Sequence, residues 1–131
     1  MPKRKILLAE DDPDDQLLFY EFLNHREDIQ ILPAVENGAE LIDLLESIGE
    51  KNAMPQLIIL DHNMPKKNGL QTLEYLKGSD RFRDIPVMIY STYVDELLEK
   101  STLKLGACLV YGKPDTKIGY GEMIDAFLGC L

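Results

Sequence analysis

Residues 57–69 read LIILDHNMPKKNG, an apolar run that stops at an acidic residue. Its four aliphatic residues do not alternate with polar ones, which is typical of a β-strand buried on both faces. Asp61 ends the run, and the Asn68-Gly69 pair then opens a helical pattern. The stretch therefore predicts a buried strand that carries a carboxylate at its carboxyl end and is followed by a helix.

The same strand-then-helix order occurs along the whole chain. The other expected strands are residues 6–9, 29–35, 87–90 and 107–111, and helices are expected to open at Asp12, Asn37, Asn68, Asp95 and Ile118. The first two helices are expected to bury Leu17, Leu18, Phe22, Leu23, Leu41, Ile42, Leu44, Leu45 and Ile48. Five alternations predict an α/β fold with a parallel sheet and helices on both faces.

Composition narrows the class of protein. The chain has 131 residues, 45% of them hydrophobic and 28% charged, which is ordinary for one globular domain. The net charge of -9 disfavours binding to nucleic acid, which needs a basic surface. No apolar run is long enough for a signal peptide or a membrane span, so we expect a cytoplasmic protein without membrane contact. Two cysteines do not make a disulfide framework or a metal motif.

Polar residues follow the expected strands at the places where parallel sheets bind ligands. Glu10 and Asp11 follow the first strand, Asp61 the third and Ser91-Thr92 the fourth, while Lys113 follows the fifth. Clustered carboxylates repel one another unless a cation lies among them, and oxygen ligands suit Mg²⁺. A carboxylate screened in this way accepts a phosphoryl group, and a lysine and a hydroxyl neutralise and bind its oxygens.

These strand ends resemble the receiver domain of two-component response regulators. The resemblance rests on residues 5–13, 57–69, 85–92 and 112–114, which occur in the family's order, each at a strand end, and it covers essentially the whole chain. It implies a flavodoxin-like (βα)5 fold with strand order 2-1-3-4-5. It also implies that residues 1–131 form a single receiver domain with no output domain. The PKKNG run and the Ser-Thr pair resemble stand-alone receivers that are paired with phytochrome-type histidine kinases.

The resemblance assigns a role to each matching residue. Asp61 is expected to be phosphorylated, and Asp11 to bind Mg²⁺ directly together with Asp61. Glu10 is expected to act through water, and Asn63 through its backbone carbonyl. Ser91, with Thr92 beside it, is the expected switch hydroxyl. Lys113 is the expected phosphate-binding lysine, and its bond to Pro114 is expected to be cis.

The chain departs from the family pattern at two positions, the first of which is Ser91, where the family usually has threonine. Val110 stands where the family often has an aromatic residue that rotates with the switch, so the transmission of the signal is left open. Asn63 and Tyr93 occupy the positions that tune phosphate loss, and Tyr93 is expected to shield Asp61 from water. His62 is interpreted as a rim residue rather than a ligand.

Other classes of protein fit the sequence less well. A haloacid-dehalogenase-type phosphatase would need a second aspartate where Asn63 stands, and the acids after the first strand would repel a flavin phosphate. A degenerate receiver that acts only as a docking module is the third alternative. We expect no enzyme but a phosphoacceptor that takes its phosphoryl group from a histidine kinase or a histidine phosphotransfer protein. The strand 4–helix 4–strand 5 surface would then signal to an unidentified protein, and dimerisation stays open.

Overall fold

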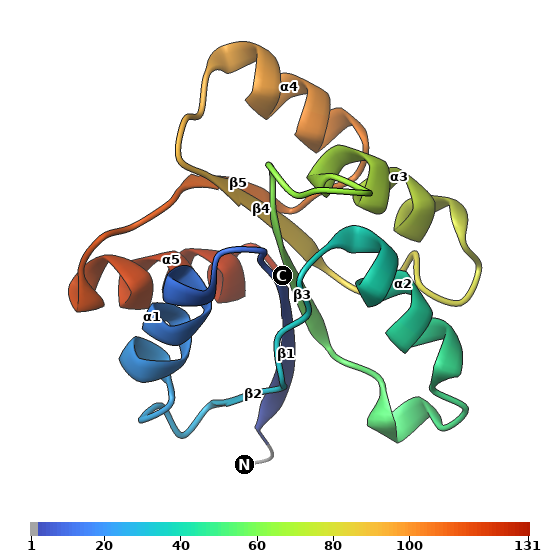
Figure 1. Cartoon of the computed structure of the whole chain (residues 1–131), viewed down its shortest axis with the longest axis horizontal. Helices are drawn as coiled ribbons and strands as arrows, with labels where there is room; N and C mark the ends of the chain where they lie inside the picture. The colour runs from blue at the N-terminus through green and yellow to red at the C-terminus, as the bar shows by residue number, and fades with distance from the viewer. Residues whose placement is uncertain (1–2) are drawn as a thin grey trace.

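The computed structural model describes residues 3–131, and five parallel strands form its centre (Figure 1). The strands are β1 (Arg4–Ala9), β2 (Ile29–Ile31), β3 (Leu57–Asp61), β4 (Val87–Ser91) and β5 (Leu109–Gly112). They lie in the order β2-β1-β3-β4-β5, which is the expected flavodoxin-like order. The helices are α1 (Pro13–Leu23), α2 (Gly38–Ser47), α3 (Gly69–Gly78), α4 (Glu96–Lys104) and α5 (Lys117–Gly129), with a short 3₁₀ turn, η1 (Lys51–Ala53).

The sheet separates two apolar cores. All residues of β3 and β4 are buried, as the absence of polar alternation in their sequences predicts. One core packs the sheet against α1 and α5, and the other packs it against α2 and α3. Figure 1 shows α1 and α5 side by side on one face, with α2 and α3 on the other. Within residues 3–131, no helix is long and apolar enough to cross a bilayer.

Four of the five predicted helix starts are confirmed by their caps, and the fifth helix begins at Lys117, one residue before the predicted Ile118, with Thr116 as its cap. The side chains of Asp12, Asn37, Asn68 and Asp95 each accept a hydrogen bond from a backbone N–H in the first turn of the helix that follows. Each such bond satisfies a donor that has no partner within the helix. These caps fix where the chain leaves the sheet edge, and so they fix the loops that carry the polar strand ends.

Two predicted core positions were wrong. Leu17 is 54% exposed and Leu44 is 37% exposed, whereas Phe19, which was not predicted, is fully buried. In α1 the fully buried residues are Phe19 and Leu23, one helical turn apart, with Leu18 and Phe22 half-buried beside them. The predicted face of α1 was therefore correct for Leu18, Phe22 and Leu23 and wrong at one edge, where Phe19 and not Leu17 faces the core.

The edges of the sheet are shorter than predicted. The strand expected over residues 29–35 ends at Ile31, and Pro33, which has no N–H to donate, interrupts it before an isolated bridge joins Val35 to Ala9. The strand expected over residues 107–111 covers Leu109–Gly112 instead. The loop after Gly112 therefore begins at Lys113, directly at the carboxyl edge.

Gly69 lets α3 begin against the end of β3. A Cβ on Gly69 would lie 2.7 Å from the backbone oxygen of Asp61 and 3.0 Å from the Cα of His62. The Gly69 N–H also donates to the His62 carbonyl at 3.2 Å. The close approach holds the turn that carries Asp61, and no larger residue fits there without moving that turn.

We predict that Gly69→Ala lowers the free energy of unfolding by roughly 1–3 kcal/mol, because backbone atoms must shift to admit the methyl group. The control is Gly78→Ala at the other end of α3, where a Cβ would meet nothing within 4 Å. Urea unfolding followed by circular dichroism measures both. Equal stability of the two variants would contradict the importance of this contact.

Candidate functional site

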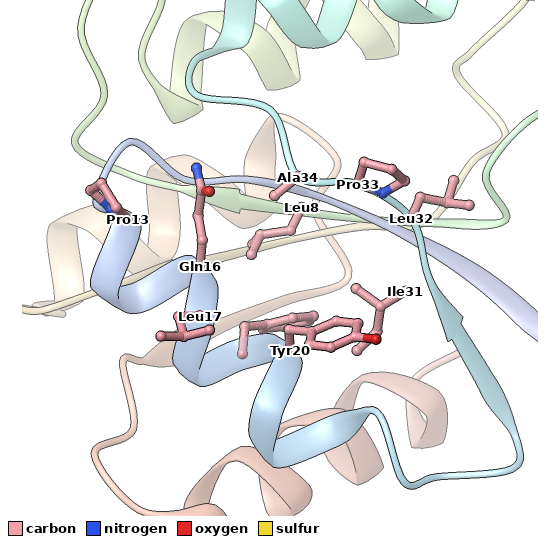
Figure 2. A pocket seen from close by; sticks show the side chains of 10 residues that line it. Leu8, Pro13, Gln16, Leu17, Tyr20, Ile31, Leu32, Pro33 and Ala34 are labelled. Carbon is pink, nitrogen blue, oxygen red and sulfur yellow. The ribbon is translucent and has the colours of Figure 1, made fainter.

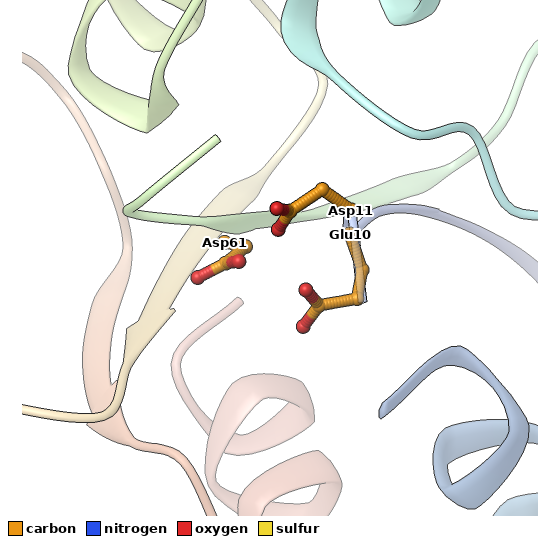
Figure 3. A group of neighbouring side chains, drawn as sticks. All are labelled: Glu10, Asp11 and Asp61. Atoms are coloured by element: carbon orange, nitrogen blue, oxygen red, sulfur yellow. The ribbon is translucent and has the colours of Figure 1, made fainter. Parts of the chain in front are cut away.

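Three carboxylates lie together at the carboxyl edge of the sheet (Figure 3). Glu10 and Asp11 follow β1, and Asp61 ends β3. Because β1 and β3 are neighbours with Ala9 opposite Leu60, the three side chains start from adjacent points. One oxygen of each lies within 4.8 Å of the others. The structure thus brings together the acids that the sequence predicted.

Burial makes this cluster electrostatically costly. Glu10 has no exposed surface and Asp61 only 4%, whereas Asp11 is exposed. Burial, followed by the hydrogen bond and charge of Glu10, raises the pKa of Asp61 to about 8, although Lys113 and the Asn63 N–H act in the opposite direction. The site therefore favours a cation or a proton at Asp61.

Lys113 supplies the balancing charge. Its Nζ lies 2.9 Å from Glu10 Oε1, 3.0 Å from Asp15 Oδ2 and 3.7 Å from Asp61 Oδ1. Burial opposes the charge, but hydrogen bonds to Glu10 and Asp15 outweigh it and raise the pKa of Lys113 above its ordinary value. The backbone N–H of Lys113 donates to the Ser91 carbonyl at 2.8 Å, which anchors the lysine beside the end of β4.

Two contacts in this cluster were not predicted. Asp15 lies in the first turn of α1, where the helix dipole favours an acid, and it forms an ion pair with Lys113. Its place on the first turn of α1, close to the end of β1, was the available signal. Tyr90 was assigned no role, but its hydroxyl donates to Glu10 Oε1 at 2.6 Å, and no sequence pattern announces that contact. Burial and then the nearby Glu10 charge raise the pKa of Tyr90, which keeps the hydroxyl protonated as a donor.

The donor set fits Mg²⁺. The candidate ligands are carboxylate oxygens, two of them on buried side chains, and Asp11 is exposed, so water could complete the coordination shell of a bound ion. Asn63 lies on the same turn, where its N–H approaches Asp61 Oδ1 at 3.4 Å. The use of the Asn63 carbonyl as a ligand stays a prediction.

A hollow of about 260 Å³ opens beside these acids. Its lining is His62, Asn63, Ser91, Tyr93, Asp95 and Leu98. Ser91 is buried at the end of β4 and its Oγ accepts the Tyr93 N–H at 3.3 Å, whereas Thr92 is exposed. The Tyr93 side chain is 73% exposed at the mouth of this hollow. Of the Ser-Thr pair, Ser91 is therefore the hydroxyl placed at the rim.

The structure also shows the surroundings of His62 and Val110. His62 is half-buried at the rim, and among residues 3–131 its Nδ1 has no hydrogen-bond partner. Val110 is half-buried on β5, while its neighbour Tyr111 packs into the core formed with α1 and α5. Because successive strand residues point to opposite faces, Tyr111 does not stand in for an aromatic residue at position 110.

The predicted cis bond before Pro114 is wrong. No peptide bond among residues 3–131 is cis, so the Lys113–Pro114 bond is trans. The trans form is ordinarily favoured by about 0.5–1 kcal/mol. Here it is compatible with the contacts of Lys113 to Glu10 and Asp15, so the lysine reaches the acids without a cis turn.

A second hollow, of about 410 Å³, lies between α1 and the segment after β2 (Figure 2). Its lining comes from Leu8, Pro13, Gln16, Leu17, Phe19, Tyr20, Ile31, Leu32, Pro33 and Ala34. None of these side chains is charged, so this groove has no group that would neutralise a phosphate. Of the two hollows, the one beside the carboxylate edge is therefore the better candidate for binding a phosphoryl group.

A comparison with protein-family models shows to which family the chain belongs. The family model described as the response regulator receiver domain matches residues 6–118. The chain belongs to this family. The part of the chain that the family model matches contains the acid pair, Asp61, Ser91 and Lys113. The residues of the candidate site therefore all lie within the receiver domain.

Curated relatives differ in length. The response regulator Rcp1 of Synechocystis is 33% identical over 97 residues, covering 72% of this chain and 66% of that protein. The polar-differentiation response regulator DivK of Brucella anthropi is 28% identical over 132 residues and 98% of each chain is covered. A protein-glutamate methylesterase/glutaminase of Vibrio vulnificus is 26% identical over 130 residues. This chain spans only 35% of the length of that enzyme, although 94% of this chain is covered.

Solved receiver structures superpose closely. The phosphorylated cyanobacterial phytochrome response regulator RcpA has a TM-score of 0.81 at 28% identity, covering 94% of this chain and 89% of that one. The Mn²⁺-bound form of Rcp1 has a TM-score of 0.75 at 28% identity, covering 98% of this chain and 89% of that one. The receiver fold is thus shared over almost the full chain.

We predict that the stability of the metal-free protein falls as the pH rises from about 4 to about 8. Over this range the folded protein keeps a proton on Asp61 that the unfolded chain has released, so the folded state binds more protons and rising pH favours unfolding. Asp61→Asn should remove this slope and raise the free energy of unfolding at pH 8 by on the order of 1–3 kcal/mol.

Urea unfolding in the presence of a chelator, at several pH values, measures this slope. The matched control is Asp43→Asn, which changes an exposed carboxylate on α2. If the free energy of unfolding changes with pH in the same way for the wild-type protein and Asp61→Asn, burial does not raise the pKa of Asp61.

Proposed function

We propose that this receiver is the phosphoacceptor of a two-component phosphorelay and that Asp61 carries the phosphoryl group. The observation that carries the proposal is the convergence of Glu10, Asp11 and Lys113 on the Asp61 carboxylate. A surface aspartate would need none of these partners. The phosphoryl donor is a phosphohistidine of a histidine kinase or of a histidine phosphotransfer protein.

The chain's own residues supply positioning and charge. An Asp61 carboxylate oxygen attacks the phosphorus, the P–N bond to the donor imidazole breaks, and the imidazole leaves with the electron pair. Lys113, 3.7 Å from Asp61 Oδ1, is placed to neutralise a phosphoryl oxygen. Ser91, at the rim of the neighbouring strand, donates a hydrogen bond to another.

Glu10, Asp11, Asp61 and the Asn63 carbonyl would hold Mg²⁺. When bound, Mg²⁺ screens the approach of an anionic phosphoryl group to a carboxylate. The Mn²⁺-bound form of the similar protein Rcp1 supports the proposal that a divalent cation binds here. Mg²⁺ itself is proposed because the ligands are oxygens and Asp11 is open to water.

The output surface is proposed to be β4–α4–β5. Ser91 and Tyr93 connect the site to Asp95, the cap of α4. Thr102 is the only fully buried residue of α4, and Leu97 is 74% exposed, so this helix is weakly anchored and offers apolar surface to a partner. With Val110 on β5, the switch would work through Ser91 and the loop to α4 rather than through rotation of an aromatic side chain.

The upstream partner is proposed to be a phytochrome-type histidine kinase. The names of RcpA and Rcp1 among the similar proteins support this choice, since RcpA is described as a phytochrome response regulator. The kinase would dock near α1, where Leu17 and Tyr20 are about half exposed, and near the loop after β5. The net charge of -9 favours a protein partner in the cytoplasm over nucleic acid.

A phosphorylation assay on the wild-type protein and on Asp61→Asn tests the proposed function. The wild-type protein, with Mg²⁺ and either acetyl phosphate or a phosphorylated histidine kinase, should gain one phosphoryl group, and Asp61→Asn should gain none. Lys113→Ala should slow the reaction roughly 100-fold, because a charge-neutralising group is lost. Mass spectrometry measures the added mass, and Asp43→Asn serves as a surface control. If neither donor labels the wild-type protein, the chain is a docking module.

We further predict that Tyr93→Ala shortens the lifetime of the phosphorylated state. The Tyr93 N–H donates a hydrogen bond to Ser91 Oγ, and Tyr93 lines the hollow next to the site, where its side chain would restrict the approach of water. Decay of the phosphorylated protein without a partner measures the effect, with Tyr20→Ala on α1 as an exposed-tyrosine control. An unchanged decay rate for Tyr93→Ala would remove the shielding role.

A further inference from the structure

The most unusual polar contact of the core is the one between Tyr90 and Glu10. Both residues are fully buried, and the Tyr90 hydroxyl donates to Glu10 Oε1 at 2.6 Å. The same oxygen lies 2.9 Å from Lys113 Nζ, and Lys113 Nζ stands 4.9 Å from the centre of the Tyr90 ring. One tyrosine therefore touches both the buried acid and the lysine that balances it.

The direction of the Tyr90 side chain follows from the sheet. Tyr90 lies opposite Asp61 across β3 and β4, and its ring belongs to the core formed with α1 and α5. Glu10 follows β1, on the other side of β3, so the hydroxyl spans the width of one strand to reach it. A phenylalanine would fill the same apolar space, and the hydroxyl is the part that apolar packing does not require.

The other contacts of Glu10 show what the Tyr90 hydroxyl contributes. Glu10 Oε2 accepts the Asp12 N–H at 3.1 Å, and Oε1 is held by Lys113 and Tyr90. Lys113 also binds Asp15, and it would be drawn toward a phosphoryl group on Asp61. When the lysine moves, the tyrosine hydroxyl is the side-chain donor that stays on Glu10 Oε1.

We propose that Tyr90 is a positioning residue that holds the Glu10 carboxylate in the orientation required for divalent-cation binding. The proposal rests on the proposed function, because it takes the acid cluster as the cation site. Hydrogen-bond partners of metal-binding side chains typically contribute 10- to 100-fold to metal affinity. Loss of the hydroxyl leaves Lys113 as the remaining side-chain partner of Glu10 Oε1, so the orientation of the buried carboxylate is less firmly fixed.

Tyr90→Phe removes the hydroxyl and keeps the ring. The matched control is Tyr120→Phe: Tyr120 is buried in the same core, and among residues 3–131 its hydroxyl has no hydrogen-bond partner. Isothermal titration calorimetry with Mg²⁺ should show affinity reduced roughly tenfold or more for Tyr90→Phe and unchanged for Tyr120→Phe. Equal or tighter Mg²⁺ binding by Tyr90→Phe overturns the inference.

A kinetic readout separates positioning from a general structural effect. With acetyl phosphate as donor, the Mg²⁺ concentration at half-maximal rate should rise roughly tenfold in Tyr90→Phe, while the rate at saturating Mg²⁺ stays close to that of the wild type. A damaged fold would lower the maximal rate as well, and that result would overturn the inference.

A double-mutant cycle with Glu10→Gln identifies the residue through which Tyr90 acts. In the Glu10→Gln background, Tyr90→Phe should change Mg²⁺ affinity little, because the carboxylate that it positions is gone. An undiminished effect overturns the inference while leaving the phosphoacceptor function intact. A wild-type protein that is not phosphorylated and binds no Mg²⁺ would instead overturn both proposals.

Discussion

Repulsion between buried carboxylates is the constraint around which this structure is built. Glu10 and Asp61 are almost without solvent, and their oxygens come close to each other and to Asp11. Such a cluster is stable only with positive charge, and the folded protein supplies one ammonium group, on Lys113. One lysine is shared among Glu10, Asp15 and Asp61, so the acid cluster has fewer positive than negative groups, and this charge balance favours the binding of a cation.

The arrangement of the sheet brings the acids together and keeps them in place. Parallel order 2-1-3-4-5 places β3 at the centre, so Asp61 has β1 with the acid pair on one side and β4 with Ser91 on the other. Two apolar cores fix the strands from above and below, and Gly69 lets α3 press on the turn after Asp61. The apolar packing thus offsets the unfavourable electrostatics at one edge, and function is gained at the cost of stability.

The sequence predicts those parts of the site that depend on strand ends, and it fails where a contact depends on side-chain reach. Asp61, Glu10, Ser91 and Lys113 follow apolar runs directly, so parallel pairing alone brings them to one edge. The contact of Asp15 with Lys113 spans 98 positions and needs the actual angle of α1. Leu17 was predicted to be buried and Phe19 was not, but the structure shows the opposite. The buried face of a helix depends on tertiary packing, which the local apolar pattern does not specify.

Tyr90 shows how the departures from the family pattern fit together physically. An aromatic residue is missing at position 110 on β5, yet Tyr90 occupies the neighbouring strand, directly before the switch hydroxyl Ser91. Because side chains alternate along a strand, Tyr90 points to the α1–α5 core while Ser91 takes the other face. Tyr90 is thus committed to Glu10 and cannot also rotate with the α4 surface. Under the proposed function, the Tyr90 side chain would therefore serve the acid cluster, and Ser91 and the loop that Asp95 caps would carry the signal to α4.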